Sequence, residues 1–239
     1  MTLSDSPVQK TVAWAVHLFT ATGVVLAALA LLSIVNDNPV ACIFWLAVSL
    51  IIDGIDGTLA RKFNVKNILP QVDGSVLDLI TDYLTYVFIP VLFMYYYVPF
   101  PENTTLFILG CILISSLYCF SNIGMKSTDN YFVGFPATWN IVALYFYLLD
   151  MGFWFNLIVC LVLCVLTFSK IKFLHPFRVK ELMPLNILAT GIWFATSLIL
   201  ANDHISTGGN DIVWILWWVS SLYIFVVCLW RTWFKNNNQ

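Results

Sequence analysis

The sequence has 239 residues, of which 60% are hydrophobic and only 10% carry a charged side chain, with a formal net charge of −2. Charged residues make up about a quarter of an average soluble domain, so this composition excludes an ordinary soluble protein and is typical of a polytopic membrane protein. No basic tract suggests nucleic-acid binding.

Eight apolar segments follow one another along the chain. A transmembrane helix needs about 20 mostly apolar residues, and in lipid only helices or closed barrels satisfy every backbone polar group. The segments are too long for barrel strands, so the sequence predicts an all-α polytopic membrane bundle that forms a single domain, 1–239. The predicted spans are 13–35, 39–60, 75–98, 104–123, 137–152, 153–169, 184–201 and 211–230.

Lysine and arginine residues indicate the orientation of these spans. With eight spans, alternate loops lie on the same side, and all 11 Lys and Arg residues then fall on one side, together with both termini. Lys and Arg are enriched in cytoplasmic loops. The pattern therefore predicts cytoplasmic N- and C-termini. The turn between spans five and six is marked only by Asp150 and Gly152.

Four aspartates occupy matching positions in the second and third spans. Asp53 and Asp56 lie in "DGIDGTLAR", at the cytoplasmic end of span two, and Asp78 and Asp82 lie in "GSVLDLITD", at the start of span three. Each stretch covers roughly 12 Å of helix, so the four carboxylates should lie at similar depth. At about 100° per residue, each pair shares one helix face. If these faces meet, four carboxylates surround one cavity.

Several carboxylates side by side in a low-dielectric site need compensation, most often by a divalent cation. The candidate ligands are all oxygen atoms and neither stretch contains a histidine, which favours Mg²⁺, Mn²⁺ or Ca²⁺ over zinc. A single aspartate at a helix end is commonly a snorkelling or paired surface residue. Acids inside membrane segments are costly, however, so that explanation is weak for four of them.

Small residues and one arginine accompany the acids. Gly57 and Ala60 leave room for a ligand beside the helix, and Gly74 lets a second helix or a nucleotide approach closely. Arg61 can offset anionic charge through two parallel hydrogen bonds. Metal ions and an arginine at a membrane interface suit a pyrophosphate substrate. Asp73 precedes span three and is predicted to cap its N-terminus.

The eight fixed positions, from Asp53-x2-Asp56-Gly57-x2-Ala60-Arg61 to Gly74-x3-Asp78-x3-Asp82, resemble the signature of the CDP-alcohol phosphotransferases. Those enzymes transfer a phosphatidyl or similar group from a CDP-activated donor to an alcohol and release CMP. Here 12 residues separate Arg61 from Gly74, a longer spacer than in most members. The spacer, the eight spans and the stretches 129–140 and 175–179 resemble the bacterial branch whose acceptor is choline.

The resemblance implies an integral enzyme of the bacterial inner membrane, with its active site facing the cytoplasm, that makes phosphatidylcholine from CDP-diacylglycerol and choline. It implies two divalent ions, Mn²⁺ or Mg²⁺, held by Asp53, Asp56 and Asp78, with Asp82 helping to hold the second ion and acting as general base. It also implies a homodimer. The positions that match contacts to CDP are Gly57, Ala60, Arg61 and Gly74.

Choline is a quaternary ammonium, which proteins typically recognise with aromatic faces. Aromatic residues also form belts at membrane interfaces, so each candidate has this second explanation. A cluster of basic residues after span six is either a clamp on the lipid phosphate or a positive-inside anchor. The choline candidates are Tyr83, Tyr86, Tyr131, Trp139 and Asn140, and the lipid-phosphate candidates are His175, Arg178 and Lys180.

Two alternatives remain open at this level. The acceptor could be serine, inositol phosphate or glycerol phosphate, although a phosphorylated acceptor would need basic residues around the cavity, and cytoplasmic Lys and Arg are sparse. A membrane transporter would be expected to carry charges near the midplane and paired broken helices. The acids instead gather at one face, and no internal repeat is visible.

Overall fold

The computed structural model describes residues 6–122, 131–174, 179, 181–203 and 211–234. These residues group into two compact units, Met1–Leu92 and Phe93–Gln239. The four signature aspartates all belong to the first unit. The prediction of a single domain stays a prediction.

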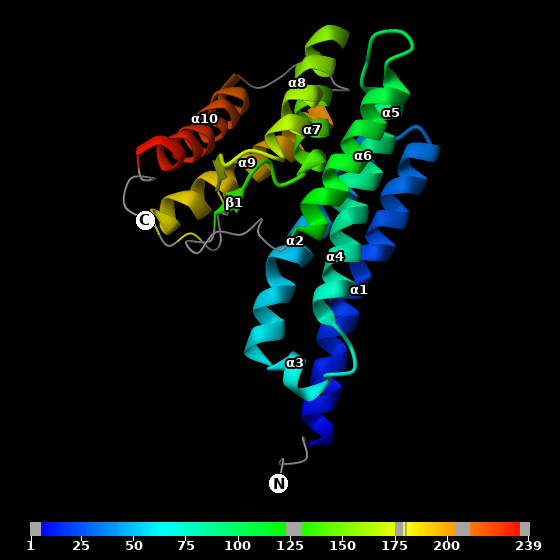
Figure 1. The fold of residues 1–239 in the computed structure, drawn as a ribbon, viewed down its shortest axis with the longest axis vertical. Coiled ribbons are helices and arrows are strands. Elements are labelled where there is room, and N and C mark those ends of the chain that lie inside the picture. Colours follow the sequence, from blue (N-terminus) through cyan, green and yellow to red (C-terminus); the bar gives the residue numbers. More distant parts are fainter. Residues whose placement is uncertain (1–5, 123–130, 175–178, 180, 204–210, 235–239) are drawn as a thin grey trace. The chain divides into compact units, whose positions relative to one another are not determined.

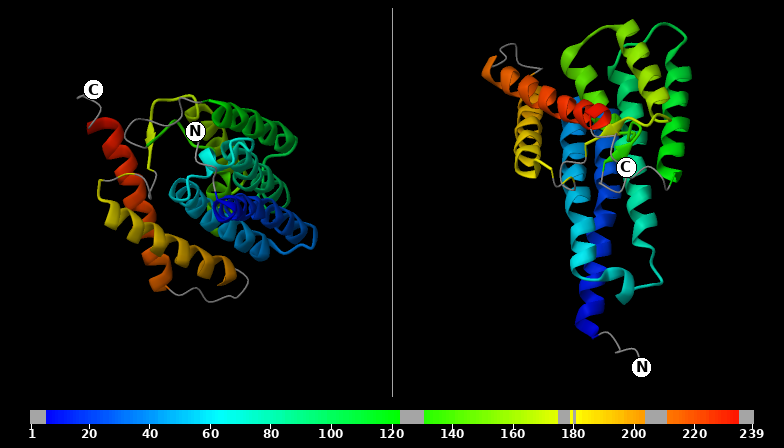
Figure 2. Two further views of the ribbon diagram at one scale, coloured as in Figure 1. Left: turned by 90° about the horizontal axis from the view of Figure 1, so that it is seen from below. Right: turned by 60° about the vertical axis from the view of Figure 1, so that its left-hand side comes forward.

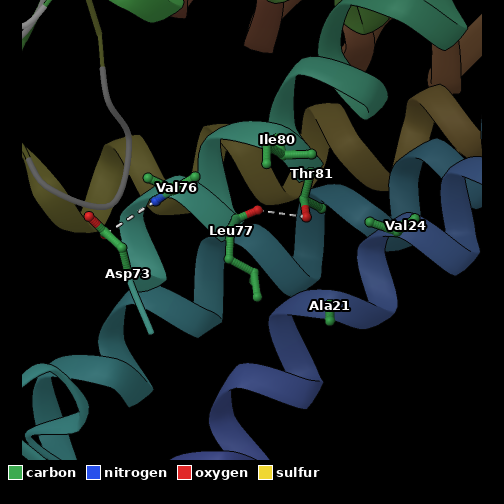
Figure 3. Close-up of a pocket in the computed structure, with 7 residues that line it drawn as sticks. All are labelled: Ala21, Val24, Asp73, Val76, Leu77, Ile80 and Thr81. Atoms are coloured by element: carbon green, nitrogen blue, oxygen red, sulfur yellow. Dashed lines mark hydrogen bonds between the residues drawn. The ribbon is translucent and has the colours of Figure 1, made fainter. Parts of the chain in front are cut away.

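The first unit contains three long helical segments, which run side by side in Figures 1 and 2. They are α1 (Pro7–Val35), α2 (Pro39–Lys62) and a continuous segment made of α4 (Gly74–Asp82), η1 (Tyr83–Phe88) and the beginning of α5 (Ile89–Tyr97). Local sequence sets their N-termini. Ser6 and Gln9 form a capping box ahead of α1, and Asn38 caps α2. The predicted cap on α4 is confirmed, because the Asp73 carboxylate accepts hydrogen bonds from the N–H groups of Ser75 and Val76. Figure 3 shows the bond from Val76.

The long spacer between the two halves of the signature is folded. Its residues form the short helix α3 (Val65–Ile68), which contacts both α1 and α2. Val65, Ile68 and Leu69 are buried in one cluster with Ala13 and Val16 of α1. The spacer is therefore a packed connection that ties the C-terminal end of α2 to α1 before α4 begins.

The segment after Asp82 is a π-helix, η1, in which the Ile89 N–H donates to the carbonyl of Leu84. Pro90 gives a physical reason for this change. Proline has no N–H and its ring clashes with the carbonyl four residues earlier, which here belongs to Tyr86. A π turn pairs residues five apart, so it lets the helix pass the proline without breaking. The sequence predicts one continuous span here but does not predict the π segment inside it.

In its described part, the second unit contains the end of α5, five further apolar helices and a minimal sheet. Helices α6 and α8 pack together, α7 packs on α9, and α9 and α10 cross in Figure 2. Strands β1 (Phe132–Val133) and β2 (Lys172–Phe173) pair antiparallel, with Phe132 opposite Phe173. The helices are α6 (Thr105–Ser121), α7 (Trp139–Leu149), α8 (Phe153–Leu166), α9 (Met183–Asp203) and α10 (Asp211–Phe234).

Buried and half-buried polar side chains join three of these helices. The Tyr145 hydroxyl of α7 donates to Ser221 Oγ of α10 at 2.7 Å and accepts from Trp193 Nε1 of α9 at 3.0 Å. Trp217 Nε1 of α10 donates to Ser197 Oγ of α9 at 2.9 Å. In a membrane protein, such bonds between helices supply cohesion that apolar contact alone does not.

Every predicted span coincides with a described helix, which confirms the all-α membrane architecture. Among the described residues, five helical segments are long and apolar enough to cross a membrane: Pro7–Val35, Pro39–Lys62, Gly74–Tyr97, Met183–Asp203 and Asp211–Trp233. Helices α6, α7 and α8 are apolar but shorter, at 17, 11 and 14 residues. The predicted turn between α7 and α8 is confirmed, since Asp150 and Gly152 both have positive φ, at 42° and 85°.

The contact between α1 and α4 depends on one glycine. A Cβ atom built on Gly23 would lie 2.3 Å from Cγ2 of Thr81, far inside van der Waals contact. Thr81 cannot easily turn away, because it is buried and its hydroxyl donates to the carbonyl of Leu77 (Figure 3). Since Asp82 follows Thr81, any displacement of α4 at this contact moves a signature aspartate.

For the transferase activity that the signature implies, we predict that Gly23→Ala lowers turnover by at least about tenfold, because a shift of about 1 Å at a reacting group is costly. Thr81→Ser removes Cγ2 and keeps the hydroxyl, so the nearest approach to the new methyl group becomes the 3.8 Å contact with Cβ of residue 81. The double variant should therefore recover most of the activity. Equal losses in Gly23→Ala with and without Thr81→Ser would contradict this account.

Candidate metal centre

Three of the four signature aspartates come together in the structure. Asp53 of α2 and Asp78 and Asp82 of α4 each offer a carboxylate oxygen, and the three oxygens lie within 4.8 Å of one another. All three residues are half-buried. Two helices thus bring together acids that are about 30 positions apart in sequence, as the spacing predicts.

The donor set fits a hard divalent cation. Mg²⁺ binds oxygen at about 2.0–2.1 Å and Ca²⁺ at about 2.3–2.6 Å, so oxygens on opposite sides of one ion are separated by about 4–5 Å. Oxygens within 4.8 Å of one another can therefore share an ion.

Asp56 lies one turn beyond Asp53 on α2 and is buried, with 5% of its surface exposed. Its oxygens are not among the three that lie together. The expected group of four carboxylates is thus present as three neighbours and one deeper acid. A role for Asp56 as a metal ligand stays a prediction.

The four positions predicted to contact CDP lie around the C-terminal end of α2 and the start of α4. Arg61 is exposed, and its Nη2 donates to Thr58 Oγ1 at 3.1 Å. Gly57 is half-buried, and Ala60 packs against the cluster that α3 forms with α1. Arg61 therefore has its guanidinium on the surface, where an anionic ligand can reach it.

Gly74 has a packing role that the sequence reading left open. A Cβ on Gly74 would lie 3.0 Å from Cε1 of His17, a buried residue of α1 to which the sequence reading gave no role. The close approach at Gly74 is thus made by a neighbouring helix of the same unit. Whether a nucleotide also approaches there stays a prediction.

The tyrosines predicted to bind choline differ in their surroundings. The Tyr86 hydroxyl donates to Oδ2 of Asp53 at 2.6 Å, while Tyr83, next to Asp82, is half-buried. The sequence predicts Tyr86 near the site but does not predict its bond to Asp53. The signals that could have found it are the eight-residue distance from Asp78 to Tyr86 and the proline four residues further on.

The remaining choline candidates belong to the second unit. Trp139 is fully buried and its Nε1 donates to Ser116 Oγ at 2.8 Å, and the Tyr131 ring lies 5.5 Å from the guanidinium carbon of Arg231. Asn140 is half-buried. A choline-binding role for these residues stays a prediction. The lipid-phosphate candidates His175, Arg178 and Lys180 lie outside the described residues.

An open, mainly apolar groove runs along the contact between α1 and α4 (Figure 3). Its lining includes Asp73 and Thr81 but none of the four signature aspartates. The Asp73 carboxylate is already engaged in capping α4. The groove is therefore separate from the aspartate triad of α2 and α4.

We predict that Asp78→Asn weakens Mn²⁺ binding strongly, because it removes the charge of a ligand. Changes to residues outside the ligand shell typically weaken metal binding about 10- to 100-fold, and the loss at Asp78 should be larger. Isothermal titration of the purified protein in detergent measures this directly. Asp37→Asn is the matched control, since Asp37 is an exposed residue with φ of 51°, a conformation that asparagine tolerates. Equal Mn²⁺ affinity in the Asp78 variant and the control would exclude the triad as the metal site.

Comparison with known proteins agrees with this geometry. The chain matches the family model of the CDP-alcohol phosphatidyltransferases over residues 11–169, a range that includes the whole signature. It is 55% identical over 230 residues to a phosphatidylcholine synthase of Pseudomonas aeruginosa, covering 96% of each chain.

More distant relatives carry the same name. Identity is 43% over 178 residues to a phosphatidylcholine synthase of Borreliella burgdorferi, covering 74% of this chain and 76% of the relative. It is 36% over 215 residues to one of Rhizobium johnstonii, covering 90% and 88%. With its five long apolar helices and its aspartate triad, the chain is a multi-pass membrane protein that belongs to the CDP-alcohol phosphatidyltransferase family.

Proposed function

We propose that this protein is a phosphatidylcholine synthase, which transfers the phosphatidyl group of CDP-diacylglycerol to choline and releases CMP. The observation that carries the proposal is the triad of Asp53, Asp78 and Asp82, within a chain that aligns along almost its whole length with a phosphatidylcholine synthase. The family match runs from residue 11 to 169 and so crosses the boundary between the two units, which supports one domain over 1–239.

In this proposal Asp53, Asp56 and Asp78 hold two divalent ions, Mn²⁺ or Mg²⁺, with Asp82 helping to hold the second. When bound, such ions neutralise phosphate oxygens and stabilise the charge that develops on the CMP leaving group. The oxygen-only donor set supports this choice of metal. Arg61, exposed at the end of α2, adds a positive charge on the nucleotide side.

Asp82 is the proposed general base. It accepts the proton of the choline hydroxyl while the choline oxygen forms a bond to the phosphorus of the phosphatidyl group and the bond from that phosphorus to the CMP oxygen breaks. Choline keeps its permanent positive charge, so the acid's negative charge also favours its approach. Tyr83 lies beside Asp82 and can offer an aromatic face, and Tyr131, Trp139 and Asn140 are further candidates for the choline site.

The proposal also includes orientation and assembly. All 11 Lys and Arg residues fall on the side of the two termini when the eight helices each cross the membrane, which supports a cytoplasmic active site in the bacterial inner membrane. His175, Arg178 and Lys180 fall on the same side, as a clamp on the lipid phosphate would require. We expect the enzyme to be a homodimer.

We predict that purified protein with CDP-diacylglycerol and Mn²⁺ releases CMP when choline is added, with formation of a new zwitterionic lipid. Serine, inositol phosphate and glycerol phosphate, added one at a time, should give little or no release. CMP release with one of these alcohols would retain the metal-dependent chemistry and reject choline as the acceptor. Release with none, from folded protein with bound Mn²⁺, would reject the transferase assignment.

We predict that Asp82→Asn lowers turnover by at least about 100-fold, since general bases typically contribute a factor of 10² to 10⁴. The protein should still insert and purify, because the amide is almost isosteric with the carboxylate. Turnover is measured at saturating Mn²⁺, so that a weakened ion site does not mimic the loss of the base. Normal turnover in this variant would rule out Asp82 as the base.

A further inference from the structure

One hydrogen bond connects the aspartate triad to a residue outside the signature. The Tyr86 hydroxyl donates to Oδ2 of Asp53 at 2.6 Å, across 33 positions of sequence. This distance lies in the range of about 2.5–2.7 Å typical of a hydroxyl that donates to an ionised carboxylate. We infer that Tyr86 is a positioning residue of the metal centre, which holds the Asp53 carboxylate in the orientation that an ion requires.

The chemistry of the carboxylate permits both roles at once. An ionised aspartate has two oxygens and about four lone-pair directions, so one oxygen can accept from the tyrosine while a lone pair remains for a cation. Outer-shell hydrogen bonds of this kind fix the orientation of metal ligands. The phenol is a neutral donor, and it therefore orients Asp53 without cancelling the negative charge that attracts the metal.

The bond also links the same two helical segments as the triad. Asp53 belongs to α2, whereas Tyr86 belongs to η1, which follows α4 directly. Asp78 and Asp82 approach Asp53 from α4, and Tyr86 approaches it from the next turn. The Asp53 carboxylate thus meets two acids of α4 and a hydroxyl from η1, and rotation of its side chain would break the bond to that hydroxyl.

The π segment explains how Tyr86 reaches this place. In a regular α-helix four residues turn about 400°, so each step of four drifts about 40° around the helix. Asp78 to Asp82 is one such step. A second α-helical step, from Asp82 to Tyr86, would turn Tyr86 further around the helix, away from the face that carries the two acids. A π turn contains more residues, so each residue turns less and the drift is reduced. Because η1 begins at Tyr83, it affects Tyr86 but leaves the spacing of the two acids unchanged.

The opposite side of the same segment faces α1. Thr81 and Thr85 are buried, and their hydroxyls donate to the carbonyls of Leu77 and Thr81 within the segment itself. The α4–η1 segment therefore has one face of self-satisfied threonines against α1 and another of acids and tyrosine toward α2. This packing fixes the side of the segment that faces α1, and Tyr86 lies on the side that faces α2.

Tyr86→Phe tests the inference, since it removes the hydroxyl and keeps the ring. Tyr96→Phe is the matched control, because it removes a hydroxyl from an exposed tyrosine of α5, in the same continuous helical segment. The probe is Mn²⁺ alone, titrated into purified protein in detergent, with free Mn²⁺ followed by electron paramagnetic resonance. We expect the Kd of Tyr86→Phe to rise about 10- to 100-fold and that of the control to stay at the wild-type value.

Kinetics separate this role from the predicted choline contact. If Tyr86 positions Asp53, raising the Mn²⁺ concentration should restore most of the turnover of Tyr86→Phe, with KM for choline unchanged. A Kd for Mn²⁺ within twofold of wild type would overturn the inference. A raised KM for choline at unchanged Mn²⁺ affinity would also overturn it and would place Tyr86 in the acceptor site.

The inference rests on the metal centre of the proposed function, but the two can fail separately. A wild-type protein that binds Mn²⁺ but does not transfer the phosphatidyl group to choline would reject the proposed function. In that case, weaker Mn²⁺ binding by Tyr86→Phe would still support the positioning role. Conversely, normal transfer to choline with unchanged Mn²⁺ affinity in the variant would reject the positioning role alone.

Discussion

The mutual repulsion of Asp53, Asp78 and Asp82 is the constraint on which the rest of the first unit depends. Three carboxylate oxygens within 4.8 Å of one another repel strongly where water is scarce. A bound cation attracts all three carboxylates and offsets their mutual repulsion. Without a cation, the protein must hold the acids together through other contacts. Much of the packing between α1, α2 and α4 can be understood as the framework that does so.

That framework uses close contacts and few large side chains. Gly23 lets α1 lie directly against Thr81, and Gly74 leaves room for the buried imidazole of His17. The spacer helix α3 fastens the end of α2 to α1 through a small apolar cluster. Each of these contacts holds α2 or α4, the two helices that carry the triad, against α1 directly or through α3. Stability and the geometry of the metal centre therefore draw on the same residues.

The sequence predicts what depends on periodicity and charge, namely the helical segments, the pairing of Asp53 with Asp78 and Asp82, and the cap made by Asp73. It does not predict η1, the burial of α3 or the bond from Tyr86 to Asp53. Those features arise because a proline must be accommodated and because side chains far apart in sequence meet. The deeper position of Asp56 was missed for a similar reason, since helical spacing gives direction but not the reach of a side chain.

The position of Asp53 along α2 makes its depth in the membrane depend on the thickness of the hydrocarbon layer. From Pro39 to Asp53 an α-helix rises about 21 Å, whereas the hydrocarbon layer is about 30 Å thick. If α2 enters the layer at Pro39, the acid lies short of the far boundary, beneath lipid chains unless protein and water surround it. Longer acyl chains would deepen that burial and shorter chains would bring headgroup water closer. The acyl-chain length of the surrounding lipids would thus alter the hydration of the aspartate triad.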